Sequence, residues 1–131
     1  MQRTDSIAWG IVAVFLTAVV AVTLAFGSSD ARSNAALPTG DDIVTAEVTI
    51  EGMHFVPNSV EVPAGKRLVL KVTNPDTQQH DLKIGSGYTG RINPGESVVY
   101  DFGEFTEDAQ GWCTIAGHKA MGMVFTVKAT G

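Results

Sequence analysis

Short segments in which apolar and polar residues alternate follow one another from Ile43 to the end of the chain. In the first segment, residues 43–51, four apolar side chains fall on one face: Val44, Ala46, Val48 and Ile50. Because successive side chains of a strand point to opposite sides, this alternation is typical of a strand with one buried face. It does not fit the period of an amphipathic helix.

Further segments repeat the pattern, and turn residues such as Pro, Gly and Asn separate them. Their apolar positions are Val60 and Val62; Leu68, Leu70 and Val72; Leu82 and Ile84; Val98, Tyr100 and Phe102; and Met123, Phe125 and Val127. Short alternating strands without a long amphipathic helix predict an all-β domain over residues 43–131, an antiparallel β-sandwich or barrel. Residues 103–111 are predicted to form a loop or a short helical turn.

Residues 7–27 form an uncharged apolar run of 21 residues at the N-terminal end of the chain. As a helix this run would be roughly 31 Å long, which matches a hydrocarbon core of about 30 Å, so it predicts a single membrane-spanning anchor. A cleavable signal peptide is the alternative, although the apolar core of such a peptide has only about 7 to 15 residues. Either interpretation places the domain outside the cytoplasm, in a periplasm or at the cell surface.

The polar residues 28–42 have the composition of a flexible linker and include a proline and a glycine. The predicted organisation is therefore a membrane anchor or signal segment at 1–27, a linker at 28–42 and one domain at 43–131. The formal net charge of −5 is unlike the basic character of a nucleic-acid-binding domain. We expect no nucleic-acid partner.

Residues 113–123 contain the single cysteine of the chain, one of its three histidines and two of its four methionines. Four residues separate Cys113 from His118, and four separate His118 from Met123, so one loop can supply a thiolate, an imidazole and a thioether. This combination favours copper. An unpaired thiol outside the cytoplasm is open to oxidation unless it is buried or ligated, which also favours a metal site. Trp112 is expected to face the opposite side of the strand from Cys113 and to be a packing residue.

A third strong ligand must come from another segment, and His80 is the leading candidate because it lies between the turn-rich residues 74–79 and a predicted strand. His54 has no cysteine or carboxylate in its motif and is interpreted as a partly exposed histidine. Two histidines, one cysteine and a distant methionine form a blue-copper electron-transfer site. The predicted cofactor is one type 1 copper, and its predicted ligands are His80, Cys113, His118 and Met123.

Met121 is the alternative to Met123 as the weak axial ligand. Met123 is in register with Phe125 and Val127 on the apolar face of the last predicted strand, whereas Met121 lies in the loop. We therefore predict that Met123 is the axial ligand and that Met121 belongs to an apolar patch around His118. The other members of this patch are Ala116, Gly117, Ala120 and Gly122.

The loop ligands and the upstream His80 resemble the copper motifs of the cupredoxin family of small blue copper proteins. The two four-residue spacings are most similar to the rusticyanin branch of that family. The resemblance covers roughly residues 43–131, including MHFVPNSVEVPAG at 53–65. It implies a cupredoxin-like Greek-key β-sandwich, here preceded by a single N-terminal transmembrane helix, with His80, Cys113, His118 and Met123 as the copper ligands.

The resemblance also implies a hydrogen bond next to the copper ligands. Family members often have an asparagine after the first copper histidine, and it bonds to the loop after the cysteine. Asp81 and Thr114 occupy these two positions here. Such a bond fixes ligand geometry, and an ionised Asp81 is expected to favour Cu(II) and to lower the reduction potential relative to asparagine.

The predicted function is membrane-tethered electron transfer, in which the copper cycles between Cu(I) and Cu(II). The expected partners are extracytoplasmic redox proteins, such as a cytochrome, an oxidase or a reductase, and the membrane through residues 7–27. A buried site without an open coordination position predicts no enzymatic activity and no small-molecule substrate at the copper. The alternative is the electron-input domain of a larger nitrite reductase or multicopper oxidase, which would need histidine-rich sites that this chain lacks.

Overall fold

A computed structural model describes residues 36–131, in which it places nine strands and one short helix. The strands are β1 (Ile43–Glu51), β2 (His54–Val56), β3 (Ser59–Pro63), β4 (Arg67–Thr73), β5 (Lys83–Ile84), β6 (Gly87–Tyr88), β7 (Ser97–Glu104), β8 (Ala109–Trp112) and β9 (Val124–Thr130). The helix, η1 (Lys119–Met121), is a single 3-10 turn. The predicted anchor at 7–27 and part of the predicted linker lie outside the described residues. Within those residues, no helix has the length and apolar character needed to cross a membrane.

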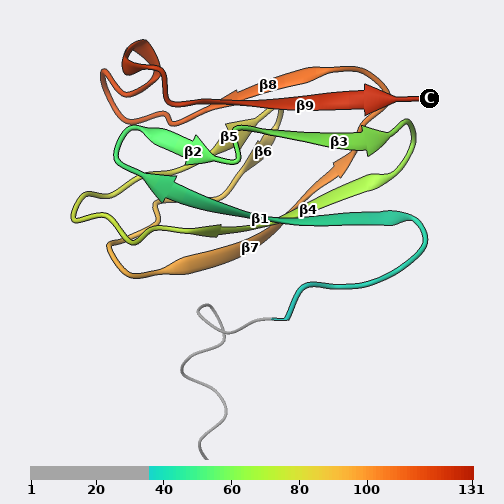
Figure 1. The fold of residues 1–131 in the computed structure, drawn as a ribbon, viewed down its shortest axis with the longest axis horizontal. Coiled ribbons are helices and arrows are strands. Elements are labelled where there is room, and N and C mark those ends of the chain that lie inside the picture. Colours follow the sequence, from blue (N-terminus) through green and yellow to red (C-terminus); the bar gives the residue numbers. More distant parts are fainter. Residues whose placement is uncertain (1–35) are drawn as a thin grey trace, which may run out of the picture. The chain divides into compact units, whose positions relative to one another are not determined.

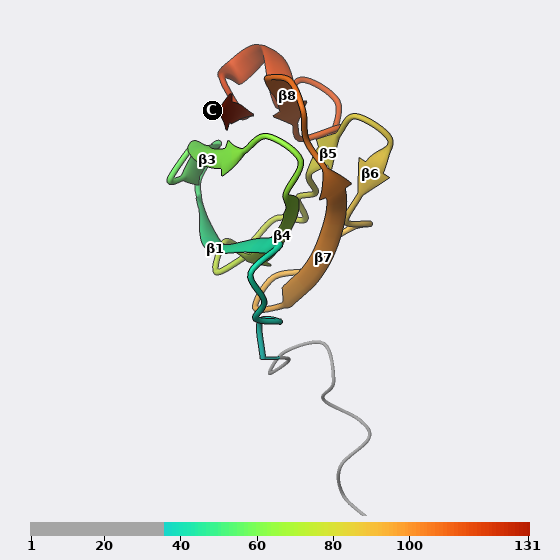
Figure 2. The same ribbon diagram turned by 90° about the vertical axis from the view of Figure 1, so that its right-hand side faces the viewer.

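The nine strands form two sheets that pack face to face (Figures 1 and 2). One sheet has the order β2-β1-β4-β7, and the other has the order β3-β9-β8-β5-β6. The predicted all-β sandwich is therefore confirmed. The loops that carry the candidate metal ligands gather at one end of the sandwich, on the left in Figure 1, beside η1.

The expectation of a purely antiparallel sandwich is wrong for two strand pairs. β1 pairs in parallel with β4, and β3 pairs in parallel with β9. After β1 and β2 the chain crosses to the other sheet as β3 and then returns as β4, so β4 runs in the same direction as β1. A parallel pair requires such a crossover connection, and the alternation within a strand carries no information about it.

The prediction of a loop over residues 103–111 is also corrected. β7 extends to Glu104 and β8 begins at Ala109, so only four residues connect them. The register of β7 against β4 shifts at Leu68/Val69, next to Gly103, whose φ of +83° is left-handed. A bulge of this kind bends the strand and interrupts the period of two without ending the pairing.

The apolar faces predicted from the alternation meet between the two sheets. Side chains that are no more than 1 % exposed include Val48, Ile50, Val62, Leu68, Leu70, Val72, Ile84, Phe125 and Val127. Each contributes roughly 1.5–3 kcal/mol through burial. Phe55 of β2 meets Phe125 of β9 edge to face, with ring centroids 6.2 Å apart, and this contact joins the two sheets. The sandwich is therefore a rigid frame for the loops at its end.

Gly111 lies on the inner face of β8, two residues before Cys113, and has no space for a side chain. A Cβ atom there would be 2.5 Å from Ile84 Cγ1 and 2.8 Å from the Lys83 carbonyl oxygen. Neither neighbour can move easily, because one is buried and the other is backbone within β5. This glycine therefore permits the close approach of β8 to β5.

We expect Gly111→Ala to lower the free energy of unfolding by about 1–3 kcal/mol, as overpacked core positions do. Urea denaturation of the metal-free chain measures this change. Gln110→Ala is the matched control, since Gln110 is the exposed neighbour of Gly111 on the same strand. Equal urea midpoints for Gly111→Ala and the wild type would contradict the close approach.

Candidate metal centre

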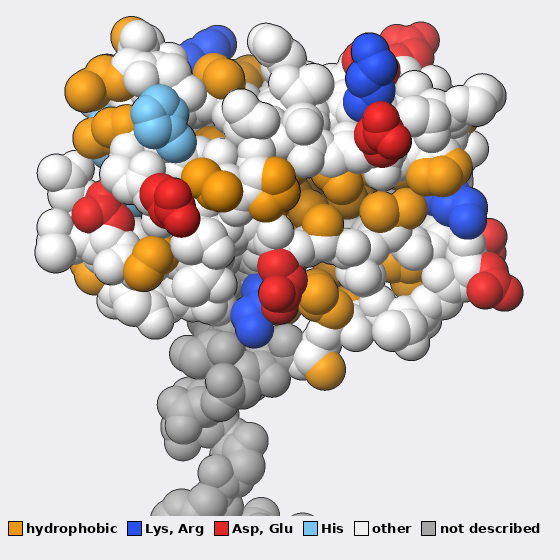
Figure 3. Space-filling model, viewed as in Figure 1, with side chains coloured by type: hydrophobic (Ala, Val, Ile, Leu, Met, Phe, Trp, Pro, Cys, Tyr) orange, Lys and Arg blue, Asp and Glu red, His pale blue; other side chains and the backbone are white. Residues whose placement is uncertain are grey.

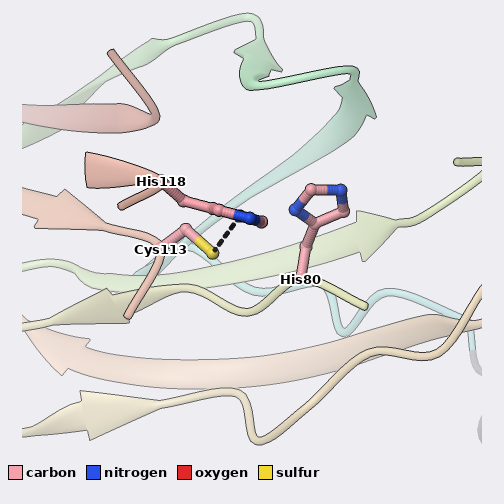
Figure 4. A group of neighbouring side chains, drawn as sticks. All are labelled: His80, Cys113 and His118. Atoms are coloured by element: carbon pink, nitrogen blue, oxygen red, sulfur yellow. Dashed lines mark hydrogen bonds between the residues drawn. The ribbon is translucent and has the colours of Figure 1, made fainter. Parts of the chain in front are cut away.

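Three side chains from separate parts of the sequence meet at the loop end of the sandwich (Figure 4). One possible ligand atom from each of His80, Cys113 and His118 lies within 4.8 Å of the other two, and all three residues are buried. Cys113 Sγ is 3.6 Å from His118 Nδ1, and the two imidazole ring centroids are 5.1 Å apart. The structure thus brings together three of the four predicted ligands at distances that one metal ion can bridge.

Backbone hydrogen bonds hold the segment that carries His80. The His80 amide donates to the Ile92 carbonyl at 3.2 Å, and the Ile92 amide donates to the His80 carbonyl at 2.7 Å. These two bonds form an isolated antiparallel bridge outside the named strands. Because the bridge fixes the backbone of His80, its imidazole ring extends from a defined position beside the loop after β8.

The loop that carries the other ligands is closed by its own backbone. The Cys113 amide donates to the Met123 carbonyl at 3.1 Å, and the Met123 amide donates to the His118 carbonyl at 3.1 Å. Gly122 follows η1 as its C-terminal cap, and its φ of +97° lies in the left-handed region that favours glycine. The chain therefore turns sharply from η1 into β9, and both ends of the loop stay together.

The imidazole of His80 has one nitrogen bonded and the other without a partner. His80 Nε2 lies 2.8 Å from Asp76 Oδ2, whereas the buried Nδ1 has no hydrogen-bond partner in the described structure. The pKa of Asp76 is lowered, mainly because its carboxylate bonds to His80. Metal-binding histidines commonly use the second nitrogen in this way, with a carboxylate that orients the ring. The unpaired Nδ1 therefore fits a metal ligand.

The thiol of Cys113 also fits a metal centre. The side chain is fully buried, and burial raises the pKa of the thiol. A thiolate in this position needs a nearby positive charge to compensate for its lost hydration, which a bound metal ion supplies. One thiolate and two imidazoles in a buried, closed arrangement are consistent with a type 1 copper site.

The two candidate axial methionines differ sharply in exposure. Met123 is fully buried immediately before β9, whereas Met121 is 62 % exposed on η1. Met121 therefore lies at the surface, and its place in an apolar patch around His118 stays a prediction. The role of Met123 as the axial ligand remains a prediction.

Substitution separates the two methionines. We expect Met123→Gln to change the visible spectrum and the reduction potential of the copper-loaded chain, because glutamine replaces a thioether with a harder oxygen donor. Met121→Gln, the matched control, should leave both unchanged. The reverse result would assign the axial position to Met121.

Asp81 joins the His80 segment to the loop after Cys113. Its carboxylate is fully buried and accepts two bonds from Thr114, from the amide to Oδ1 and from the hydroxyl to Oδ2, both at 2.6 Å. The predicted Asp81–Thr114 hydrogen bond is thus present. The structure adds two partners for Oδ2, the Tyr88 hydroxyl at 2.8 Å and Arg91 Nε at 3.4 Å.

Sequence reasoning missed three of these supporting residues. Tyr88 and Arg91 reach Asp81 because the chain after β5 folds back beside it, and no local pattern indicates that contact. For Asp76 a signal existed, since it lies four residues before His80 within the turn-rich stretch. His54 is exposed on β2, as expected, and is not part of the metal-ligand group.

We expect Asp81→Asn to raise the reduction potential of the copper-loaded chain. Removing a buried negative charge near the metal disfavours Cu(II) by a free energy on the order of 1 kcal/mol. A spectroelectrochemical titration at neutral pH measures the change. Asp101→Asn is the control, because it removes the same charge from an exposed carboxylate of β7 that pairs with Arg67 on β4. An unchanged potential in Asp81→Asn would contradict this role.

Comparison with known proteins agrees with this geometry. The cupredoxin-like domain family matches residues 15–109. The chain is 31 % identical over 101 residues to cytochrome c oxidase subunit 2 of Thermus thermophilus, an alignment that covers 73 % of this chain and 74 % of that protein. The matched family region ends before Cys113, so the candidate ligand loop lies beyond it.

Two solved structures have the same fold. Auracyanin A, a blue copper protein from Chloroflexus aurantiacus, aligns with a TM-score of 0.60 and 18 % identity over 67 % of this chain and 99 % of its own. Auracyanin B aligns with a TM-score of 0.61 and 19 % identity over 79 % of this chain and 100 % of its own. From its sequence match, its two-sheet fold and its buried His-Cys-His group, this chain belongs to the cupredoxin-like family.

Proposed function

We propose that this chain is a membrane-tethered type 1 blue-copper protein that transfers electrons between redox proteins outside the cytoplasm. The observation that carries the proposal is the meeting of His80, Cys113 and His118 in a buried group, with ligand atoms within 4.8 Å of one another. The unpaired Nδ1 of His80 supports it. We place the predicted ligand Met123 in the fourth, weak position.

The protein's own part in electron transfer is to hold the ligands and to exclude water. When bound, copper supplies a one-electron couple between Cu(I) and Cu(II). The His80–Ile92 bridge and the Asp76 carboxylate fix one imidazole, while Asp81 and Thr114 fix the loop. Because these contacts are made between protein groups, little rearrangement needs to accompany a change in the charge of the metal.

The burial of the three ligands supports electron transfer over catalysis. Cys113 and His80 are fully buried, and His118 is 7 % exposed. Because the ligand group is this strongly buried, we propose that the chain is not an enzyme and takes no small-molecule substrate at the copper. Electrons instead leave and arrive through the apolar patch around His118, in brief contacts of small area.

The relatives support a redox partner. One relative is a subunit of cytochrome c oxidase, and auracyanin A is described as a blue copper protein. The likeness to an oxidase subunit also favours the second candidate function, an electron-input domain of a larger copper enzyme. Further copper sites would then have to come from further sequence or from another chain, because residues 1–131 contain three histidines.

We propose that residues 7–27 anchor the chain and that the domain lies in a periplasm or at the cell surface. The length and apolar composition of this run support the proposal. Washing isolated membranes with alkaline carbonate tests it, since a spanning protein stays in the pellet. Recovery of the full chain in the wash would contradict the anchor.

Adding Cu(II) to the full chain in a neutral detergent should produce an intense thiolate-to-copper band in the visible spectrum. The band should bleach with ascorbate and return with ferricyanide. His80→Gln should weaken copper binding at least tenfold, since loss of a ligand group removes a metal bond. His54→Gln is the matched control and should keep the full band, because His54 is exposed and outside the metal group.

A colourless product that ferricyanide leaves unchanged would rule out both candidate functions. Reversible bleaching without oxidase or nitrite reductase activity favours the carrier. If either activity appears with the copper-loaded chain alone, the carrier proposal is wrong.

A further inference from the structure

Lys83 and Lys119 differ from the other cations of residues 36–131 because the side chain of neither donates a hydrogen bond or forms an ion pair there. The others are bound: Arg67 to Asp101, Lys71 to Glu47, Arg91 to Asp81, Lys128 to Asp108, and Lys66 to the Asp41 carbonyl. The face shown in Figure 3 has basic and acidic side chains lying side by side in this way. In this part of an acidic chain, two unpaired ammonium groups are therefore an exception.

Both lysines are neighbours of Trp112. Lys83 on β5 is the register partner of Trp112 on β8, and Lys119 Nζ is 4.1 Å from the centroid of the Trp112 ring. Tyr88 on β6 is in turn the register partner of Lys83. Because cross-strand partners lie on the same face of a sheet, Tyr88, Lys83 and Trp112 form a row on one face.

This row lies on the outer face of the five-stranded sheet. Its members are exposed or half-buried, whereas the next residues along the strands, Gly87, Ile84 and Gly111, are buried. We define the lysine–tryptophan surface as Lys83, Tyr88, Trp112 and Lys119. A surface hollow of about 380 Å³ opens beside it, lined by Lys83, Ser86, Tyr88 and Thr114. The surface thus offers two positive charges, two aromatic rings and a concave contact.

The lysine–tryptophan surface directly adjoins the candidate metal centre. Trp112 immediately precedes Cys113 in the chain, and Lys119 immediately follows His118. Lys119 also begins η1, which ends with the exposed Met121 of the apolar patch. A protein that contacts the apolar patch therefore lies next to both ammonium groups.

We propose that the lysine–tryptophan surface binds an acidic face of the redox partner, with carboxylates of that partner facing Lys83 and Lys119. The proposal rests on the electron-transfer function proposed above and adds the chemistry of the partner. The net charge of −5 disfavours the approach of an acidic protein in general. The two unpaired lysines offset this repulsion at one place, so they orient the partner with its acidic face beside the metal centre.

Charge reversal at the two lysines tests the proposal in the full chain. Lys83→Glu/Lys119→Glu is compared with Lys66→Glu/Lys128→Glu, which changes the net charge equally. Lys66 precedes β4 and Lys128 lies near the end of β9, so both are far from the metal end of these strands. The reaction partners are two c-type cytochromes, one acidic and one basic. Stopped-flow spectroscopy measures electron exchange at matched driving force, after the potential of each variant has been determined.

We expect the Lys83→Glu/Lys119→Glu variant to react roughly tenfold more slowly with the acidic cytochrome at low salt, and this difference to vanish at high salt. The basic cytochrome should react no more slowly than with the wild type. A second measurement does not involve copper: in NMR titrations of the metal-free chain with the acidic cytochrome, the amide signals of Lys83, Trp112 and Lys119 should shift. The Lys66→Glu/Lys128→Glu variant should exchange electrons at rates within about threefold of the wild type, and the same amide signals should shift in its titration.

Equal slowing in the two double variants would overturn the proposal, because net charge alone would then explain it. In another outcome, the wild type binds phosphatidylglycerol vesicles, the Lys83→Glu/Lys119→Glu variant does not, and the cytochrome rates are unchanged. This result would assign the surface to a membrane and overturn the proposal of an acidic protein partner. These outcomes leave the electron-transfer function intact. Absence of the copper band, or of exchange with both cytochromes, would disprove that function and the present proposal with it.

Discussion

The buried carboxylate of Asp81 is the contact on which the rest of the metal centre depends. It lies next to His80 in the chain and accepts two hydrogen bonds from Thr114, the residue after Cys113. Two segments that are more than thirty residues apart are thereby joined at the point where each carries a ligand. A buried carboxylate is costly unless donors surround it, and Tyr88 and Arg91 complete that set.

Much of the fold and the site can be predicted from the sequence because both depend on local patterns. The alternation of Leu68, Leu70 and Val72 identifies a buried face without knowledge of its partner, and the spacing of Cys113 and His118 places two ligands on one loop. The pairing partners of the strands cannot be predicted in this way. Whether β4 lies parallel or antiparallel to β1 depends on where the intervening chain crosses, and no residue of either strand encodes that choice.

The parts of the site that the sequence does not predict also depend on contacts between separate segments. Arg91 reaches Asp81 across a turn, and the strand extension through Gly103 depends on a bulge against β4. Both features arise from tertiary contacts that no local pattern of residues encodes. By contrast, the Asp81–Thr114 bond could be predicted, because the family resemblance supplied a contact between these positions that the sequence alone does not reveal.

The unpaired Nδ1 of His80 connects the folding of this protein to its supply of metal. A buried nitrogen without a partner costs the metal-free fold on the order of 1–3 kcal/mol, and a metal that binds there only in the folded chain removes this cost. The metal-free form consequently opens more often than the loaded form. Proteases degrade opened chains, so the lifetime of this protein follows the availability of copper.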